Sequence, residues 1–238
     1  SFQIATIKGD GIGIDVTDAT LAVIDAAQSR VGGFSLRYRQ ILAGAGYYQE
    51  TGLDIEAEGE EMAGAADAIF LGAIGLPSVR YENGTEISPH LRLRDRFQLY
   101  AGIRPIKAYP NIPQKLSDDR AAAIDMIILR ESTEGLFYSA AVHDRCPVET
   151  DDEVQDTLRI TRKTTEKLHD FAFNMARKRK EKGSRGIVTC VDKANVFKSM
   201  AFFRKIFDER SRAFPDIEKG YNYVDAQALD LIRKPWDF

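Results

Sequence analysis

The first third of the chain alternates between two hydrophobic patterns. Short apolar or alternating runs are typical of strands, and longer runs with apolar residues on one broad face are typical of helices. In chain order the pattern predicts a strand at Phe2–Lys8, a helix at Asp15–Ala27, a strand at Phe34–Ile41, a helix near Ile55–Ala65 and a strand at Ala68–Leu71. This strand–helix rhythm indicates a parallel α/β sheet.

Two glycine-rich turns follow predicted strands, at Gly9–Gly13 and Gly72–Gly75. Ligands of parallel sheets bind outside the carboxyl ends of the strands, so both turns lie at the expected ligand edge. The first turn lacks the G-x-G-x-x-G spacing, and no acidic residue stands about 20 residues further on at the end of a second strand. We interpret it as a flexible turn and not as a standard dinucleotide-binding fingerprint.

The pattern changes near residue 100, after a helix predicted from about Ser88 to Leu99. The second region is predicted to contain, in order, strands at Ile124–Leu129 and Leu136–Val142, a polar acidic loop or arm at His143–Asp156, a helix at Thr157–Lys180, a strand at Gly186–Val191 and helices at Asn195–Arg210 and Val224–Ile232. We therefore expect two domains, at residues 1–99 and 100–238.

Composition narrows the class of protein. Hydrophobic residues make up 44% of the chain and the net charge is −3, an ordinary globular mixture without general affinity for nucleic acid. Cys146 and Cys190 have neither disulfide-framework nor zinc-ligand spacing, which fits a reducing compartment. No apolar run reaches the ~18 residues of a membrane span. These features predict a soluble, cytoplasmic protein.

Three arginines are candidates for binding an anionic substrate. Arg94 lies on the helix before residue 100, Arg104 precedes Pro105, and Arg130 ends an apolar strand. Taken singly, each is typical of a surface arginine. Taken together, three guanidiniums could hold two carboxylates through bidentate, charge-assisted hydrogen bonds.

Two further residues could carry chemistry. Lys193 follows an apolar strand, and a lysine near other cations can act as a general base, although an ordinary exposed lysine has the same pattern. Asp225 begins an apolar helix, where an aspartate is typically an N-cap but can also be a hard ligand for Mg²⁺ or Mn²⁺. Spacing alone favours the plain interpretation of both.

Five segments of the chain indicate a protein family when they are considered together. They are Lys8–Gly13, Leu93–Arg94 with Ile103–Pro105, Leu129–Gly135, Val191–Val196 and Tyr223–Ala226. In this order they resemble the β-decarboxylating dehydrogenases, the isocitrate/isopropylmalate dehydrogenase family that includes the tartrate and D-malate enzymes. The resemblance spans nearly the whole chain.

The resemblance implies a fold and a function. The fold is the isopropylmalate-dehydrogenase-like two-domain α/β fold with a mixed sheet, here without the family's C-terminal part. The activity is metal-dependent oxidative decarboxylation of a 2-hydroxy dicarboxylic acid of the 3-isopropylmalate, D-malate or tartrate type, with hydride transfer to NAD and with Mg²⁺ or Mn²⁺. The first domain lies on the cofactor side, and the second provides substrate, metal and dimer contacts.

Roles for individual residues follow from the same resemblance. Arg94, Arg104 and Arg130 match the arginines that hold the malate moiety, Lys193 matches the lysine that takes the hydroxyl proton, and Asp225 matches a metal ligand; Ile12, Gly75 and Asn195 are expected to contact NAD. The lysine and the aspartate serve the partner subunit's site in this family. A homodimer is therefore implied, clasped by the acidic arm.

The chain departs from the family in two places. The family has a tyrosine seven residues after the third arginine, where this sequence has Phe137, followed by Tyr138. Adjacent strand residues point to opposite faces, so Tyr138 reaches the site as a catalytic acid only if the predicted strand is bulged. Two more metal aspartates and the adenine-binding loop have no counterpart here. We expect either a fragment of a longer protein or a non-catalytic regulatory or structural subunit.

The helical turn before Arg94 is expected to determine substrate choice. Ser88 and His90 place polar groups where isopropylmalate enzymes have an apolar pocket wall, beside one retained leucine, Leu91. A smaller or more polar substituent is therefore favoured. The exact acid and the choice between NAD and NADP stay open, and an unrelated α/β protein that binds small anions is a further alternative.

Overall fold

The computed structural model describes residues 1–142 and 145–238, and the chain divides into two compact units, Ser1–Phe97 and Gln98–Phe238. The α/β class predicted from the sequence is confirmed. Among the described residues, parallel and antiparallel strand pairs occur in separate sheets. No helix in this part of the chain is long and apolar enough to cross a membrane.

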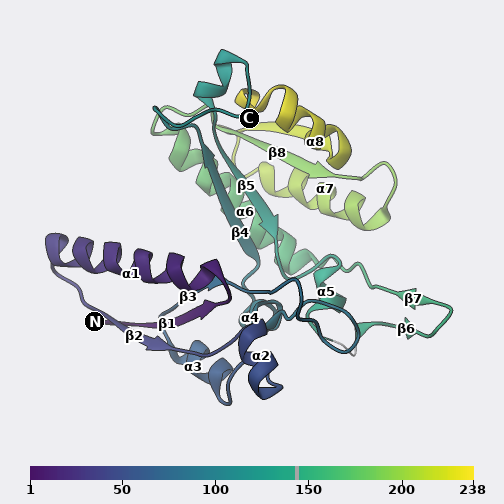
Figure 1. Ribbon diagram of the computed structural model, residues 1–238. Helices are drawn as coiled ribbons and strands as arrows, with labels where there is room; N and C mark the ends of the chain where they lie inside the picture. Colours follow the sequence, from purple (N-terminus) through teal and green to yellow (C-terminus); the bar gives the residue numbers. More distant parts are fainter. Residues whose placement is uncertain (143–144) are drawn as a thin grey trace. The chain divides into compact units, whose positions relative to one another are not determined.

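The first unit is built on a parallel sheet of order β2-β1-β3. Its strands and helices are β1 (Phe2–Gly9), α1 (Ile12–Val31), β2 (Leu36–Gln40), α2 (Ala45–Thr51), α3 (Gly59–Ala65), β3 (Ala68–Ala73) and α4 (Pro89–Phe97). Helix α1 covers one face of the sheet, and α3 lies on the other (Figure 1). The central strand β1 buries Ala5 and Ile7, which pack with Ile41 and Leu93 in the core.

The predicted order of strands and helices in this unit is confirmed, with two differences. Helix α2 was not predicted, because seven residues are too few to display a helical period. The helix predicted from Ile55 begins at Gly59, because Ile55 forms a β-bridge with Ala43 and packs into the core.

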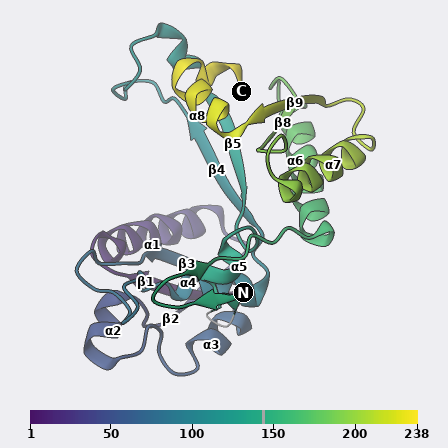
Figure 2. The ribbon, with the colours of Figure 1, turned by 90° about the vertical axis from the view of Figure 1, so that its right-hand side faces the viewer.

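The second unit combines strand pairs with three long helices. Its strands are β4 (Ala101–Lys107), β5 (Asp125–Glu131), β6 (Val148–Glu149), β7 (Val154–Gln155), β8 (Ile187–Asp192) and β9 (Glu218–Tyr223), and its helices are α5 (Phe137–Ala140), α6 (Arg162–Lys180), α7 (Lys198–Ser211) and α8 (Val224–Arg233), with 3₁₀ turns at Asp119–Ala123 and Pro235–Asp237. The β4–β5 and β6–β7 pairs are antiparallel, and β8–β9 is parallel. Figure 2 shows β4 and β5 side by side, and α6 beside α7.

Stacked aromatic rings form the core between α6 and α7. The Phe173 ring lies 5.0 Å from that of Phe207 and 5.1 Å from that of Phe214. Phe173 and Phe207 are fully buried. Offset aromatic pairs add to the free energy gained from burying their area, so this cluster fixes the two helices against each other.

The strand predicted at Leu136–Val142 is wrong. The segment contains the short helix α5, which follows Gly135 in a left-handed backbone conformation (φ 66°). A run of seven mostly apolar residues does not distinguish a strand from a short helix. The alternation argument for Phe137 and Tyr138 therefore does not apply.

Two of the longer strands, β4 and β9, were not predicted. Strand β4 contains Pro105, which lowers any strand expectation, and β9 is largely polar. The long helix α6 begins later than predicted because the Thr161 hydroxyl caps it by accepting the Thr164 N–H. Part of the predicted acidic arm forms the β6–β7 hairpin, whereas its first residues, His143 and Asp144, lie outside the described residues.

Candidate functional site

The first glycine turn is organised by Asp10, which the sequence analysis overlooked. Its carboxylate is 7% exposed and accepts three backbone N–H groups, from Ala45, Gly46 and Gly75, each at 2.8 Å. A Cβ at Gly44 would lie 2.6 Å from an Asp10 oxygen. An acidic residue inside a glycine turn after a buried strand was the signal in the sequence. The turn is thus closed by a carboxylate.

The residues expected to contact NAD occupy different environments. Gly75 uses its N–H on Asp10, Ile12 begins α1 with 70% of its surface exposed, and Asn195 is exposed in the turn after β8. Asn195 belongs to the second unit and the other two to the first. Their contact with a cofactor stays a prediction.

A hydrogen-bond network holds the start of α4. The Ser88 N–H donates to the Tyr81 hydroxyl at 3.2 Å, and that hydroxyl donates to Asp54 at 2.5 Å. Arg92 donates two hydrogen bonds to Asp54 and one to Glu60. Burial and the bond to Asp54 raise the pKa of Tyr81 to about 12, so it stays a neutral donor. The turn expected to determine substrate choice is therefore rigidly supported.

His90 carries a neutral imidazole. Burial, and secondarily the Arg94 charge, lowers the pKa of His90 to about 4. Its Nδ1 is buried and has no hydrogen-bond partner among the described residues. At neutral pH this side chain is therefore a polar, uncharged group and not a cation for a carboxylate.

The β4–β5 hairpin brings two of the three candidate arginines to one face. Gly102 pairs with Arg130, and Arg104 lies two residues further along β4, so both side chains project from the same side. The Arg104 guanidinium donates to the Ile103 carbonyl at 3.2 Å. The Arg130 guanidinium has no hydrogen-bond acceptor or ion-pair partner in the described part of the chain. Arg94 belongs to the first unit.

Phe137 and Tyr138, the two aromatic residues after β5, contact different arginines. The Arg130 guanidinium lies over the Phe137 ring, 5.2 Å from its centroid. The Tyr138 ring is covered by Arg159 at 3.7 Å and by Arg145 at 4.4 Å. Neighbouring residues of a helix do not face each other, which explains the separation. Phe137, and not Tyr138, is the ring against Arg130.

Lys193 and Asp225 meet as an ion pair. The Lys193 Nζ lies 2.5 Å from Asp225 Oδ1, and this bond lowers the pKa of Asp225. Asp225 is the second residue of α8, whose N-cap is Tyr223, so the N-cap interpretation of Asp225 was wrong. The carboxylate is 68% exposed and faces solvent as well as the lysine.

Asp225 offers one oxygen ligand for a metal ion. Within residues 1–142 and 145–238, no group of three or more His, Cys, Asp or Glu side chains could hold a metal ion. Mg²⁺ is usually held by one or two carboxylates together with water and substrate oxygens. The described residues therefore fit one position of a divalent-metal site and do not make a complete one.

The second unit also holds an apolar cavity of about 550 Å³ between β5, α6, β8 and α8. Its walls include Met126, Leu168, Val188 and Phe207, and Arg130 also lines it. The guanidinium proposed to bind a carboxylate thus lies beside an apolar surface, where a charge-assisted hydrogen bond is stronger than in water.

Related proteins align with nearly the whole length of this chain. A model of the isocitrate/isopropylmalate dehydrogenase family matches residues 3–238. The 3-isopropylmalate dehydrogenase of Carboxydothermus hydrogenoformans is 35% identical, over 100% of this chain and 63% of the relative. The 3-isopropylmalate/3-methylmalate dehydrogenase of Methanocaldococcus jannaschii is 36% identical, over 99% and 64%. The chain thus spans less than two thirds of the length of these relatives.

Solved structures give the same grouping. The isocitrate dehydrogenase of Methylococcus capsulatus superposes with a TM-score of 0.81 at 28% identity, covering 100% of this chain and 65% of that one. The β-decarboxylating dehydrogenase of Thermococcus kodakarensis gives 0.68 at 31% identity, covering 99% and 62%. Because the family model matches nearly every residue and the fold agrees, this chain belongs to the isocitrate/isopropylmalate dehydrogenase family.

Proposed function

We propose that this chain carries the substrate-binding and proton-transfer residues of an NAD-dependent β-decarboxylating dehydrogenase. Its substrate is a 2-hydroxy dicarboxylic acid of the malate type. The observation that carries the proposal is the Lys193–Asp225 ion pair, because it brings the proposed base within 2.5 Å of the carboxylate proposed to bind the metal. Family membership gives the reaction class.

Lys193 is the base of the proposed reaction. Lys193 first gives up its ammonium proton to solvent; as hydride then leaves C2 for the nicotinamide, the neutral amine takes the hydroxyl proton, and the resulting 2-keto acid loses CO₂. Asp225 would hold the metal through one oxygen, and Mg²⁺ or Mn²⁺ would supply Lewis-acid polarisation of the C2 oxygen when bound. The described residues provide one such ligand.

Arg104 and Arg130 are the proposed carboxylate-binding residues of the second unit, with Arg94 as the third. Arg104 and Arg130 share one face of the β4–β5 pair. The Arg130 guanidinium, without an acceptor among the described residues, has its donors available for a bidentate bond to a carboxylate.

The proposed substrate is D-malate or tartrate in preference to 3-isopropylmalate. Ser88 and the neutral His90 are the polar residues of the turn before Arg94, and His90 Nδ1 lacks a partner in the described chain. A polar wall stabilises an isopropyl group less than an apolar wall would, which favours a substrate with a hydrogen or a hydroxyl in its place.

The proposed assembly is a cytoplasmic homodimer with shared sites. Helix α8, which carries Asp225, exposes 50% of Leu229 and 66% of Ile232. Apolar surface of this kind on the same helix as a site residue suits burial against a second copy.

A non-catalytic subunit of the same family is the second candidate. Phe137 favours it, since a phenyl ring against Arg130 has no proton to give to the enol after CO₂ leaves. Tyr138, which the sequence offers as the alternative acid, would have to leave Arg145 and Arg159, which cover its ring.

Enzyme assays separate the two candidates. The full-length protein that contains this chain is given Mn²⁺, NAD or NADP, and each of D-malate, tartrate, isocitrate and 3-isopropylmalate, and the reduced nicotinamide is measured. We expect turnover of D-malate or tartrate and a loss of about 10²-fold or more in kcat for Lys193→Met. The exposed lysine variant Lys178→Met is the control. Absence of turnover with all four acids would favour the non-catalytic subunit.

A further inference from the structure

Asp192, the last residue of β8, has a fully buried carboxylate, and its side chain is 0% exposed. Arg204 of α7 donates from Nε to Oδ2 and from a terminal nitrogen to Oδ1, both at 2.8 Å. Oδ1 also accepts the Ala194 N–H at 2.8 Å, and the Cys190 thiol approaches Oδ2 at 3.4 Å. Both oxygens thus accept hydrogen bonds, from Arg204 of α7 and from residues next to Asp192 in sequence. A buried charge requires such partners.

The bond to Ala194 closes a turn around Lys193. An aspartate that accepts the N–H two residues further on fixes the backbone of the residue between them. On the other side, the Lys193 carbonyl accepts the N–H groups of Val196 and Phe197, each at 3.0 Å. The Lys193 backbone is therefore held from both sides.

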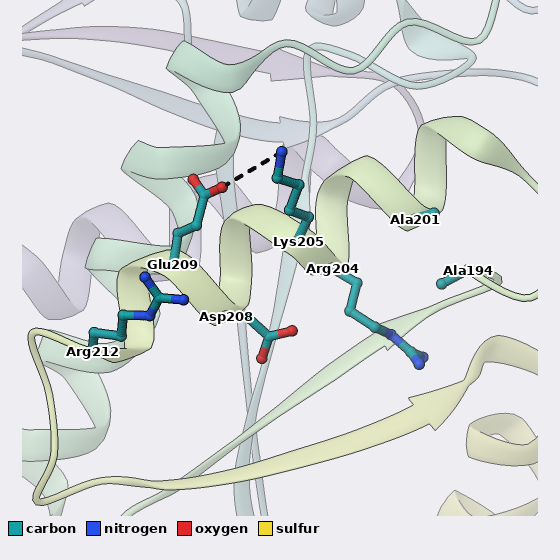
Figure 3. A pocket seen from close by; sticks show the side chains of 7 residues that line it. All are labelled: Ala194, Ala201, Arg204, Lys205, Asp208, Glu209 and Arg212. Carbon is teal, nitrogen blue, oxygen red and sulfur yellow. Dashed lines mark ion pairs between the residues drawn. The ribbon is translucent and has the colours of Figure 1, made fainter.

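Arg204 connects this turn to the residues that precede Asp225. Its guanidinium lies over the rings of Tyr221 and Tyr223, at 5.4 and 5.2 Å from the centroids. Tyr223 is the N-cap of α8, and the Lys193 Nζ lies 5.5 Å from the same ring. Figure 3 shows Arg204 leaving α7 on the side away from the Lys205–Glu209 ion pair. One guanidinium therefore contacts both segments that the Lys193–Asp225 pair joins.

We propose that Asp192 is a positioning residue: its carboxylate, clamped by Arg204, fixes the turn that presents Lys193 to Asp225. The inference rests on the proposed function for the role of Lys193 in the reaction. The clamp itself is independent of turnover, because it is made of contacts within the second unit.

The chain contains a matched control for this clamp. Asp170 of α6 accepts two bonds from Arg210 of α7, at 2.7 and 2.9 Å. This pair has the same bidentate geometry and also includes a residue of α7, but among the described residues neither partner forms a hydrogen bond or ion pair with Lys193 or its turn. Asp170→Asn therefore removes a second bidentate pair on α7, a more exposed one, and leaves the proposed clamp in place.

The direct test is competitive acetylation of the folded protein at one pH, with Lys193 labelling measured by mass spectrometry relative to the exposed Lys178. In Asp192→Asn the turn loosens, Lys193 leaves the Asp225 carboxylate, and its relative labelling rises about threefold to fivefold, the factor expected when an exposed ion pair is lost. Asp225→Asn should give the same rise, and the double variant no more than either. Asp170→Asn should leave the labelling at the wild-type value.

A second measurement uses the kinetics of the active protein. Asp192→Asn should lower kcat about tenfold with KM nearly unchanged, because substrate-binding groups stay in place while the base is misdirected. If Asp192→Asn does not fold, Arg204→Lys keeps the charge but removes the fork, and both readouts should move in the same directions. Lys193 labelling at the wild-type value in the folded variants would overturn the proposal. A protein without turnover would overturn the proposed function and leave the labelling result to decide the clamp.

Discussion

Two buried aspartates stand at the carboxyl ends of parallel strands, one in each unit, and they are satisfied in different ways. Asp10, after β1, accepts three backbone N–H groups and no side-chain donor among the described residues. Asp192, at the end of β8, accepts one backbone N–H and a bidentate guanidinium. The first carboxylate joins loop segments distant in sequence, and the second joins a strand end to a helix.

The kind of donor determines the structural role of each aspartate. Backbone donors cannot move away or be replaced, so Asp10 fixes the geometry of the loops after β1 and β3 and the start of α2. A guanidinium, in contrast, can make other contacts at the same time. Arg204 therefore connects Asp192 to the rings of Tyr221 and Tyr223. We interpret the first as a scaffold and the second as a connection between site residues.

The largest effect is expected for Asp10→Asn. An amide has one acceptor oxygen and turns its NH₂ towards the remaining N–H donors, so at least one buried donor is left unsatisfied. We expect the free energy of unfolding of the first unit to fall by about 4 kcal/mol. Urea unfolding measures it, with the exposed Asp15→Asn as the control. A loss no greater than that of the control would contradict the scaffold role.

Arg204→Met is expected to cost somewhat less. It leaves the buried Asp192 charge without its cation, which in buried pairs is strongly destabilising, although the 25% exposure of Arg204 lets water replace part of the contact. We expect a loss of about 3 kcal/mol in urea unfolding. Arg210→Met breaks the more exposed pair with Asp170 and should lose about 1 kcal/mol or less. Equal losses in the two variants would remove the distinction between a clamp and an ordinary surface pair.

Acid should weaken the second unit through His169, which packs against Phe203 and Phe207. Burial lowers the pKa of His169 to about 4, so the unfolded chain binds a proton near pH 6.5 and the folded chain does not. Stability is therefore full above pH 6.5 and declines as the pH falls towards 4, by about 2 kcal/mol at pH 5. Unfolding midpoints between pH 7 and 5 measure this slope. His169→Gln should flatten it, and an unchanged slope would assign the acid sensitivity to other groups.

Helices and strands were predicted correctly where apolar residues recur over a long segment and face the core. The strand–helix rhythm of the first unit and helices α6, α7 and α8 follow from apolar periodicity. The prediction failed where tertiary contacts determine the secondary structure. Helix α5 is a short apolar segment, and β4 pairs with β5 although it contains Pro105. The resemblance located Lys193 and Asp225, whose contact was not visible in their spacing.

The residues that were missed share a physical cause. Asp10, Asp192 and Arg204 act through partners far away along the chain or through backbone donors, which no local pattern encodes. Glu134 is a further case, since this buried carboxylate accepts the N–H and the hydroxyl of Thr161, 27 residues on. An acidic residue next to a strand end was the only local signal for the two aspartates.

Substrate binding to the second unit's arginines is the central claim, and calorimetric titration with D-malate in the absence of cofactor tests it most directly. Arg130→Gln should weaken binding about tenfold to 100-fold, the loss expected for a charge-assisted hydrogen bond, while the melting temperature changes little. Arg233→Gln, which removes another exposed guanidinium from the same unit, should bind D-malate as the wild type does. Equal affinity of wild type, Arg130→Gln and Arg233→Gln would contradict the account, because Arg130 would then be a surface residue.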